Sequence, residues 1–248
     1  KAGYFELVLT GIHMASYGRE SGETLIDAIR AVHDTPGVAR VRLGSLELDL
    51  FTDEMLVRMS KVEKFCPHFH LSLQSGSDKT LKNMNRLYDT QLYTDMMNRL
   101  RELFDKPSFT TDIIVGFPGE TEEEFQDTLT LVEEVEYEGA YTFIYSPREG
   151  TPAATYENLL TEEEKHHRLN RLNEVINEGF LKGRLRFENH IVEVLVDGPS
   201  KNNPNMMTGY TPHNMLVNFE APNVKVGDLV NVKIVKAYSW HLLGELVK

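Results

Sequence analysis

Short apolar segments alternate with amphipathic segments along residues 1–145, and this alternation limits the possible folds more than any other feature of the chain. The apolar segments have the length of buried strands, and the segments between them repeat apolar residues at helical spacing. Helices that connect consecutive strands are typical of parallel sheets. The pattern predicts an α/β fold, with strands at 6–10, 38–43, 69–73, 110–115 and 140–145 and helices near 24–33, 52–61, 78–83, 90–104 and 121–136.

A loop rich in Pro and Gly at 146–156 precedes a long helix that we expect at 161–184. Thr161 with Glu164, like Thr121 with Glu124, has the spacing of a capping box, in which two side chains satisfy the first backbone N–H groups of a helix. After this helix the apolar period changes to two, and turn residues follow at short intervals. We therefore expect three parts: the parallel α/β unit at 1–157, a linking helix at 158–184 and a small antiparallel β-barrel at 185–248.

The sequence contains one cysteine, Cys66. One thiol excludes an intramolecular disulfide and an iron–sulfur cluster ligated by this chain, and it favours a reducing, cytoplasmic location. No base or second thiol flanks Cys66, so we expect a buried packing residue rather than a nucleophile. No apolar run reaches the roughly 18–20 residues of a membrane span, and we expect no membrane partner.

The net charge of −12 is unevenly distributed. Residues 185–248 contain six Lys and Arg and six Asp and Glu, which leaves 20 of the 26 basic and 32 of the 38 acidic residues in 1–184. Phosphate groups bind where the surface is not strongly negative. A nucleic acid would therefore be held locally, by the C-terminal part.

The predicted strand at 69–73 and its flanks have a polar face. With a period of two, the apolar residues share one side and the other side carries His68, His70, Ser72 and Gln74. Because helices must cover the apolar side, we expect the polar side to line the interior of the fold and to bind a ligand. The alternative is that these polar groups satisfy one another.

Charged residues on two neighbouring strands fit the same interior. Arg40 and Arg42 share one face of their strand, and Thr110 and Asp112 share one face of theirs. A buried charge is costly unless it is paired or liganded. Contact with a ligand and a structural Arg–Asp pair are equally good interpretations.

Turns that contain glycine follow three of the predicted strands, at 10–13, 74–77 and 116–120. Ligands of parallel α/β folds bind at these strand ends, where glycine allows the backbone to approach them closely. We expect Gly116 to approach the ligand, so that Gly116→Val would block binding and leave the fold intact.

These segments resemble the radical-SAM tRNA methylthiotransferase family. Residues 112–121 are similar to the family's fifth-strand segment, which meets the adenine of S-adenosylmethionine, and residues 70–77 with 84–86 are similar to its fourth-strand segment. Residues 11–13 stand in the place of the motif that receives the methionine amino group, 145–153 resemble the sixth-strand exit, and 199–219 resemble the TRAM β-barrel. The resemblance implies a partial (βα)6 radical-SAM, TIM-like barrel with strands two to six, followed by a TRAM domain.

The resemblance also implies cofactors and partners. The cofactors are S-adenosylmethionine and two 4Fe-4S clusters of the full-length protein, whose cysteines would precede residue 1. The residues expected at S-adenosylmethionine are Gly11, Ile12, His13, Arg42, Ser45, Glu47, Gln74, Ser75, Gly76, Asp112, Val115, Gly116 and Phe117. The residues expected at a tRNA anticodon stem-loop are Lys201, Tyr210, His213, Asn214, Lys233, Lys236 and Trp240.

The reaction implied is the placement of a methylthio group on carbon 2 of the modified adenosine next to the anticodon. Residues 11–13 and 42–47 favour threonylcarbamoyl-adenosine as the substrate, whereas 141–147 and the Asn-rich segment after Lys201 favour isopentenyl-adenosine. The former markers lie in the catalytic barrel, so we lean to threonylcarbamoyl-adenosine. One other class stays open, a non-catalytic RNA-binding module. A TIM-barrel aldolase or isomerase would need a lysine or an acid–base pair at the strand ends, and no lysine lies at any of the predicted strand ends.

We predict that this chain by itself assembles no 4Fe-4S cluster and generates no radical. Such a cluster takes four cysteines, or three with one open iron site, and this sequence has only Cys66. The measurement is reconstitution with iron and sulfide followed by absorption spectroscopy. A stoichiometric cluster bound within the single chain would contradict the prediction.

Overall fold

The computed structural model describes residues 3–11, 14–18, 20–46, 48, 51–157, 160–201, 203–221 and 223–247. Its first part is a parallel sheet, as the sequence pattern predicts. Strands β1 and β2 form one pair, β3 to β6 form a four-stranded sheet in that order, and a bridge between Val41 and Phe65 connects the two. The strands are β1 Glu6–Leu9, β2 Arg40–Leu43, β3 Ser45–Leu46, β4 His68–Leu71, β5 Ser108–Val115 and β6 Gly139–Ile144.

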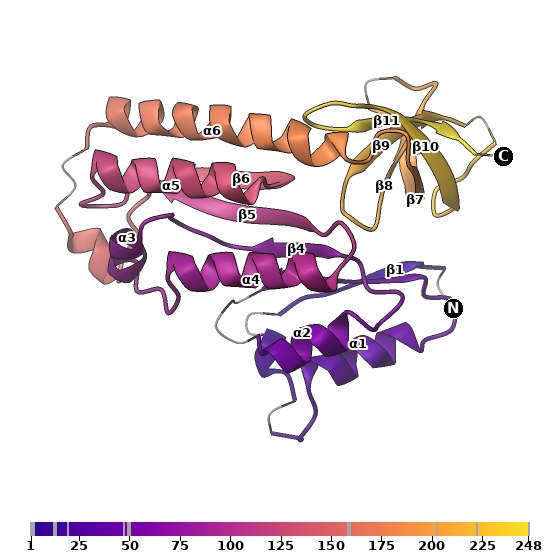
Figure 1. Cartoon of the computed structure of the whole chain (residues 1–248), viewed down its shortest axis with the longest axis horizontal. Helices are drawn as coiled ribbons and strands as arrows, with labels where there is room; N and C mark the ends of the chain where they lie inside the picture. Colours follow the sequence, from indigo (N-terminus) through magenta and orange to yellow (C-terminus); the bar gives the residue numbers. More distant parts are fainter. Residues whose placement is uncertain are drawn as a thin grey trace.

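The helices pack on one face of this sheet (Figure 1). Side chains such as Phe69 and Ile113, which are fully buried, meet apolar helix residues there. The helices are α1 Leu25–His33, α2 Asp53–Met59, α3 Asp78–Asn83, α4 Thr90–Leu103, α5 Glu122–Val135 and α6 Glu162–Leu185, with short 3-10 helices at Met14–Ser16 and Pro152–Thr155. Both predicted capping boxes form, at Thr121 and at Thr161.

The C-terminal strands form a closed barrel with a core of its own. Its strands are β7 Ile191–Pro199, β8 Met207–Tyr210, β9 Leu216–Glu220, β10 Leu229–Ala237 and β11 Leu242–Leu246. Four neighbouring pairs are antiparallel and one, β9 with β11, is parallel, so the predicted small antiparallel barrel is confirmed with a single parallel pair. The reason is geometric, because a closed ring of five strands cannot alternate in direction at every contact.

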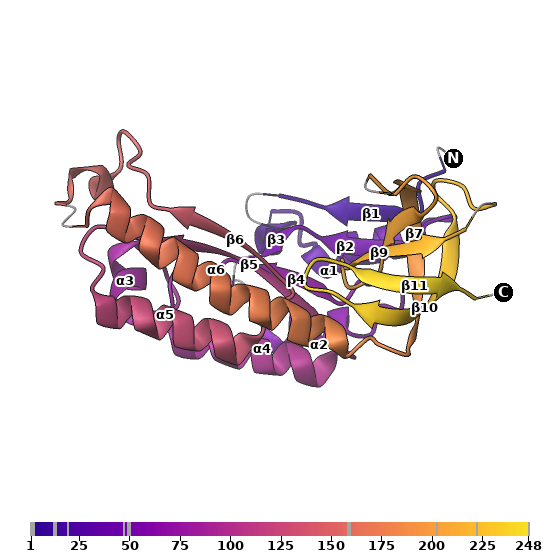
Figure 2. The same ribbon diagram turned by 90° about the horizontal axis from the view of Figure 1, so that it is seen from above.

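Two buried arginines of β2 connect the sheet to the C-terminal barrel. Arg40 donates to the Glu193 carboxylate at 2.8 Å and to the Tyr210 carbonyl at 2.9 Å. Arg42 donates to the Glu6 carboxylate at 2.8 Å and to the Pro212 carbonyl at 3.0 Å. We call these two arginines with Glu6 and Glu193 the arginine clasp, and Figure 2 shows β1 and β2 beside β7 at this end of the molecule.

The turn between β8 and β9 makes a second contact with the sheet. Ser108 at the start of β5 donates to the His213 carbonyl at 2.7 Å, and the His213 ring packs edge-on against Phe187, with ring centroids 4.9 Å apart. Burial lowers the pKa of His213 to about 4, and the neighbouring Arg186 guanidinium acts in the same direction. His213 is therefore a neutral interface residue rather than the RNA contact expected from the sequence.

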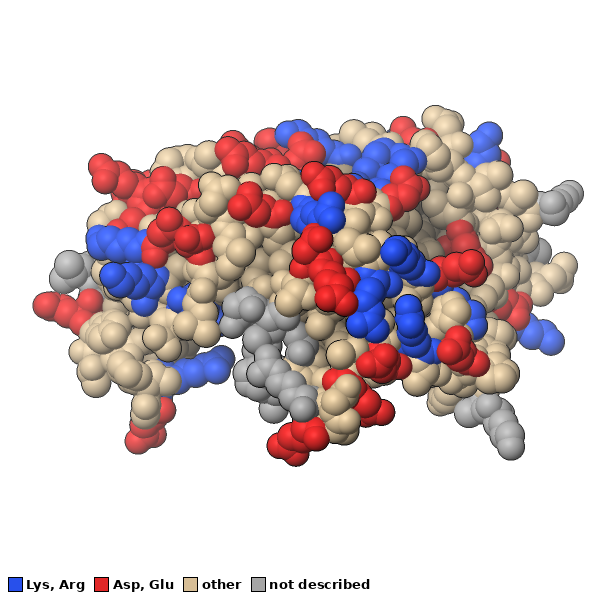
Figure 3. Space-filling view, turned by 60° about the horizontal axis from the view of Figure 1, so that its bottom comes forward, with Lys and Arg blue, Asp and Glu red and all other residues tan. Residues whose placement is uncertain are grey.

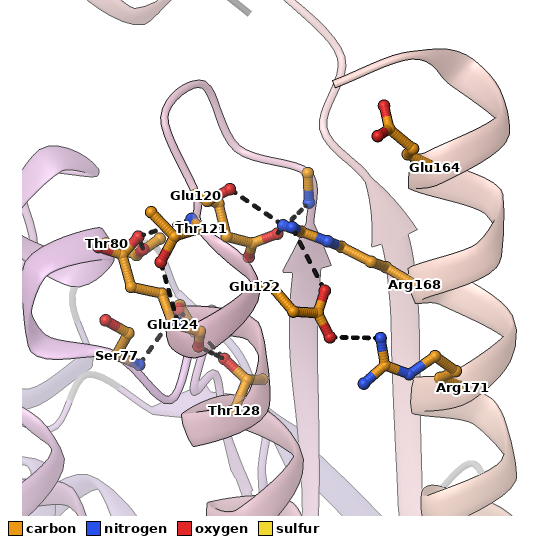
Figure 4. A network of polar contacts seen from close by, with 12 residues as sticks. Ser77, Thr80, Glu120, Thr121, Glu122, Glu124, Thr128, Glu164, Arg168 and Arg171 are labelled. Carbon is orange, nitrogen blue, oxygen red and sulfur yellow. Dashed lines mark hydrogen bonds and ion pairs between the residues drawn. The ribbon is translucent and has the colours of Figure 1, made fainter. Parts of the chain in front are cut away.

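At the other end of the sheet, a buried ion pair holds the loop between β5 and α5 against α6 (Figure 4). The Glu120 carboxylate accepts from the Gly116 N–H at 2.8 Å and from Arg168 at 2.6 Å, and the side chains of Glu120 and Arg168 are 1% and 7% exposed. Glu122 pairs with both Arg168 and Arg171, and so extends the contact between the two helices.

The packing of α6 against the loop after β5 explains why residue 116 is a glycine. Its φ is +71°, and a Cβ atom placed on it would lie 2.8 Å from Cγ of Lys165, a buried residue of α6. A side chain at this position would therefore collide with α6 rather than occupy ligand space. The expectation that Gly116→Val leaves the fold intact is wrong.

We predict that acid weakens the contact between the sheet and the barrel. The folded-state pKa of His213 lies below its ordinary value of 6.5, so the folded state is disfavoured as pH falls from about 6.5 towards 4, where unfolded chains bind the proton more readily. His213→Asn should flatten the fall of the melting temperature over this range, whereas His167→Asn, a change on the exposed face of α6, should not. Equal pH profiles for wild type and His213→Asn would contradict the prediction.

We also predict that Gly116→Ala destabilises the chain more than Gly119→Ala. Both glycines have positive φ, +71° and +85°, so both substitutions cost about 1 kcal/mol of backbone strain. Only at Gly116 would the methyl group meet Lys165, which adds about 1–3 kcal/mol of overpacking, while no atom lies within 4 Å of a Cβ at Gly119. Urea unfolding of the two variants measures the difference, and equal free energies of unfolding would refute the packing role.

Candidate functional site

The face of the sheet opposite the helices carries a connected set of polar side chains from β4 and β5. His68 Nε2 lies 3.0 Å from Thr110 Oγ1, and Thr110 Oγ1 lies 3.0 Å from His70 Nδ1. His70 Nε2 lies 3.1 Å from Asp112 Oδ2, and Ser72 Oγ donates to the same oxygen at 2.7 Å. We call this side of the sheet the open face.

The hydrogen bonds of the open face have one consistent direction. If His70 donates from Nε2 to the carboxylate, its Nδ1 accepts from the Thr110 hydroxyl, whose oxygen then accepts from His68. Burial lowers the pKa of His68 to about 3, which keeps that ring neutral. These groups thus bond to one another, much as the alternative interpretation of the sequence had it, and the series ends at Asp112, but the buried Nδ1 of His68 has no partner among the described residues.

Asp112 is the one member of the series with an oxygen left over. Hydrogen bonds from His70 and then Ser72 hold the pKa of its carboxyl below the usual value, so it is ionised at neutral pH. Its side chain is 30% exposed, and within the described part of the chain Oδ1 accepts no hydrogen bond. The open face therefore presents a fixed acceptor with a full negative charge.

Aromatic side chains of β6 lie next to this carboxylate. In the register of the sheet, Tyr141 is opposite Asp112 and Phe143 is opposite Ile114. Tyr141 is 63% exposed and Phe143 is 51% exposed on β6, which is the edge strand of the four-stranded sheet. The His70 and Tyr141 rings lie 6.2 Å apart. The sequence pattern of β6 did not predict that these aromatic residues lie beside Asp112, because aromatic residues at alternate positions also fit an ordinary surface strand.

Arg42 does not take part in this site. Its guanidinium lies within the arginine clasp, where Glu6 and the carbonyls of Thr211 and Pro212 accept its hydrogen bonds. The predicted alternative, an Arg–Asp pair, is also wrong, because the partners of both arginines are glutamates and backbone carbonyls. Ser45 is exposed and lies opposite His70 in register, at the edge of the open face.

The segment after β4 is shaped by packing on α5. Gln74 is buried with φ +65°, and its backbone exchanges hydrogen bonds with β5. The Gly76 N–H donates to Thr128 Oγ1 at 2.9 Å, and a Cβ on Gly76 would lie 2.5 Å from the Thr128 Cα. Ser75 is fully buried beside the same threonine, so Ser75 and Gly76 have structural contacts that account for them without a ligand.

At the end of β5 the side chains of Val115 and Phe117 are both buried. Val115 belongs to the core under the helices. Phe117 packs edge-on against Tyr145, with ring centroids 5.1 Å apart, and against Tyr156 at 6.4 Å. Gly11 is exposed at the end of β1, while Ile12, His13 and Glu47 lie outside the described residues. A cofactor at these strand ends would therefore contact backbone groups rather than charged side chains.

Six of the seven residues expected at RNA are exposed on the C-terminal barrel: Lys201, Tyr210, Asn214, Lys233, Lys236 and Trp240. Trp240 is 65% exposed and rests edge-on against Phe180 of α6. Two residues that the sequence analysis missed extend this group, since Tyr238 stacks on His241 and receives the Lys236 ammonium 5.0 Å above its ring. The dense aromatic content of 238–241 was the signal for them. We call Lys236, Tyr238, Trp240 and His241 the aromatic turn.

Charges are mixed over the surface. On the face in Figure 3, acidic and basic side chains lie interspersed rather than in one basic field. In the described part of the chain, no cluster of three or more His, Cys, Asp or Glu has the arrangement of a metal site, and no helix is long and apolar enough to cross a membrane. Cys66 is 1% exposed, and burial raises the pKa of its thiol to about 11. It is a packing residue.

Comparison with known proteins agrees with this architecture. Residues 11–132 match the family model of the Radical SAM superfamily, and residues 185–247 match that of the TRAM domain. Among solved structures, coproporphyrinogen III oxidase from Escherichia coli, a radical SAM enzyme, has a similar fold, with a TM-score of 0.54 and 14% sequence identity over 84% of this chain and 54% of that chain.

Curated relatives are much closer in sequence. The chain is 45% identical over 245 residues to the tRNA-2-methylthio-N(6)-dimethylallyladenosine synthase of Clostridium botulinum and 44% identical over 248 residues to that of Clostridium perfringens. These alignments cover 98% and 99% of the chain but 54% and 56% of the relatives, so the chain spans about half the length of the curated proteins it matches. The chain therefore belongs to the radical SAM superfamily, in the family of TRAM-containing proteins that includes these tRNA-2-methylthio-N(6)-dimethylallyladenosine synthases.

Proposed function

We propose that the chain forms part of a transferase that places a methylthio group on carbon 2 of an N6-modified adenosine in tRNA. The observation that carries this proposal is the identity of 45% to a tRNA-2-methylthio-N(6)-dimethylallyladenosine synthase along almost the whole chain. The names of these relatives favour a dimethylallyl, or isopentenyl, substituent on the adenosine. The preference for threonylcarbamoyl-adenosine finds no support in these names, and three of its nine markers, Ile12, His13 and Glu47, lie outside the described residues.

S-adenosylmethionine fits the C-terminal ends of β4 and β5. The buried amide of Gln74, held at positive φ, and the backbone beside Gly116 and Phe117 are the groups that would hold it. When bound there, and reduced by one electron from an iron–sulfur cluster held outside this chain, it would be cleaved to methionine and the radical that activates the target adenosine. The iron–sulfur clusters do not fit the residues of this chain, because Cys66 is alone and buried.

The chain's own contribution to RNA binding lies on its C-terminal barrel. Residues 185–248 are neutral, whereas the rest of the chain carries an excess of twelve negative charges, which repels phosphate groups. The aromatic turn combines a cation with exposed rings, and such rings stack on bases with about 1–3 kcal/mol each. We therefore assign the anticodon stem-loop to this surface, together with Lys201 and Lys233.

Deleting residues 185–248 is a poor test of this assignment. Without them the arginine clasp would lose Glu193 and three backbone carbonyls, and Arg40 and Arg42 would be left with Glu6 alone. Loss of RNA binding would then be confounded with loss of folding. Point variants of exposed residues avoid this difficulty.

We predict that Trp240→Ala weakens binding of an anticodon stem-loop about tenfold at all salt concentrations, because a stacking surface is lost. Lys236→Ala should weaken it less and lower the slope of log affinity against log salt by about one unit, because one phosphate contact is lost. Fluorescence anisotropy at several salt concentrations measures both effects. Lys61→Ala, an exposed lysine after α2, is the matched control and should change neither the affinity nor the slope.

Unchanged affinity in both Trp240→Ala and Lys236→Ala would contradict the assignment of RNA to this surface. It would favour the interpretation of the barrel as a packing domain.

A further inference from the structure

The open face offers a ligand one hydrogen-bond acceptor in a fixed position. The relay from His68 through Thr110 and His70 orients Asp112 by way of Oδ2, and Ser72 donates to that same oxygen. Oδ1 is left without a donor among the described residues, on a side chain that is 30% exposed. A partly buried network that ends in one free charged oxygen is arranged to receive an N–H or O–H group from outside.

Two large aromatic side chains of β6 lie beside this carboxylate. Tyr141 lies opposite Asp112 and Phe143 lies opposite Ile114, and the two aromatic side chains are among the more exposed large apolar residues of the sheet. An exposed ring beside an oriented acceptor is the combination with which proteins bind a single unstacked base, by stacking on its face and hydrogen bonding to its edge.

The position of the open face between two other sites points to the same ligand. At its N-terminal end, Ser108 and Arg42 contact the β8–β9 turn of the C-terminal barrel through the His213 and Pro212 carbonyls. At its C-terminal end are the strand ends that we assign to S-adenosylmethionine. Asp112 lies in the middle of β5, three residues before Val115, and so between the two.

We propose that Asp112 and Tyr141 form the subsite for the target base, and that this subsite selects an adenosine with an apolar N6 substituent over one with a carboxylate. This inference rests on the proposed function and deepens it. It also moves Asp112 from the cofactor residues, where the resemblance had placed it, to the substrate residues.

The chemistry of the two candidate nucleosides decides the selection. In N6-dimethylallyladenosine, the N6–H is a donor for Oδ1, and the branched alkene is an apolar group for Phe143 and Ile114. In N6-threonylcarbamoyladenosine, a carboxylate would be brought close to the charge of Asp112. The charged or titratable groups that act on Asp112 are His70 and the exposed Arg86, while Arg40 and Arg42 are occupied in the arginine clasp.

The test uses the full 248-residue chain with free nucleosides as probes, so that RNA binding by the C-terminal barrel does not contribute to the measured affinity. Calorimetry or saturation-transfer NMR would compare N6-dimethylallyladenosine with N6-threonylcarbamoyladenosine. We expect the wild type to favour the dimethylallyl nucleoside. Tyr141→Ala should weaken its binding about tenfold, while Tyr141→Phe, which keeps the ring, should change it by no more than about twofold.

Asp112→Asn tests the charge separately from the shape. It replaces one oxygen by an NH₂ group of similar size, so it removes the acceptor for N6–H and the repulsion of a carboxylate together. We expect weaker binding of the dimethylallyl nucleoside, tighter binding of the threonylcarbamoyl nucleoside, and hence a smaller ratio between them. Leu92→Ala is the matched control, because Leu92 is 41% exposed on α4, which packs on the face of the sheet opposite the open face. It should leave both affinities unchanged.

Several outcomes would overturn the subsite: no saturable binding of either nucleoside at millimolar concentration, equal binding of the two, or full binding in Tyr141→Ala with a wild-type melting temperature. The failure of the proposed function looks different. A chain that selects the nucleoside as described but binds no anticodon stem-loop would support the subsite and overturn the assignment of tRNA as the partner.

Discussion

The arrangement of the whole molecule depends on two arginines that are almost completely buried. Arg40 and Arg42 are 3% and 5% exposed, and a buried guanidinium without partners would cost several kcal/mol. Glu6 is the one partner that the sheet itself supplies to both. The remaining partners, Glu193 and the carbonyls of 210–212, come from the C-terminal barrel. The sheet is therefore complete only when the barrel is docked on it, and the docking position is fixed by charge rather than by apolar contact alone.

Helix α6 makes the same geometry rigid over a longer distance. Near its start, Arg168 is locked to Glu120 in the loop after β5. Near its end, Phe180 contacts Trp240, and Arg186 just beyond it pairs with Glu138. Its 24 residues span ~36 Å, so one straight element sets the separation between the strand ends and the barrel. A ligand that bridges the two ends of the sheet thus meets surfaces whose spacing the protein has already fixed.

Local features of this fold could be predicted from the sequence, and its long-range pairings could not. The strands, the helices and the capping boxes at Thr121 and Thr161 follow from residues that are neighbours in the chain, and these predictions are confirmed. Arg42 is an example of a pairing that the sequence could not predict. Its position on a polar strand face was visible, but its partners lie about 36 and 170 residues away, and a pattern of period two contains no information about them.

The same limit applies to the candidate site. That His68, His70 and Ser72 share a face followed from alternation, whereas the order in which they bond, ending at Asp112, depends on the register between β4 and β5. The sequence analysis expected Gly116 to approach a ligand, whereas the structure places it against α6. A glycine next to a ligand and a glycine under a helix cannot be told apart from the sequence alone. His213 was misassigned because a polar residue in a turn is usually exposed, and nothing local shows that this turn is covered by β5.

Under the proposed function, the distribution of charge would separate the parts of an RNA that each surface accepts. The α/β part is strongly acidic, and its open face ends in an ionised carboxylate, so a phosphate brought to that face would be repelled. A base edge carries N–H donors and no net charge, and it meets no such barrier. The neutral barrel, with Lys236 above Tyr238, has the opposite character and tolerates the backbone. If phosphates stay on the barrel and the arginine clasp holds the barrel against the N-terminal end of the sheet, the part of a bound RNA that reaches Asp112 is a base turned out of its stack. For such a partner, the acidity that at first argues against a nucleic acid would serve to orient it.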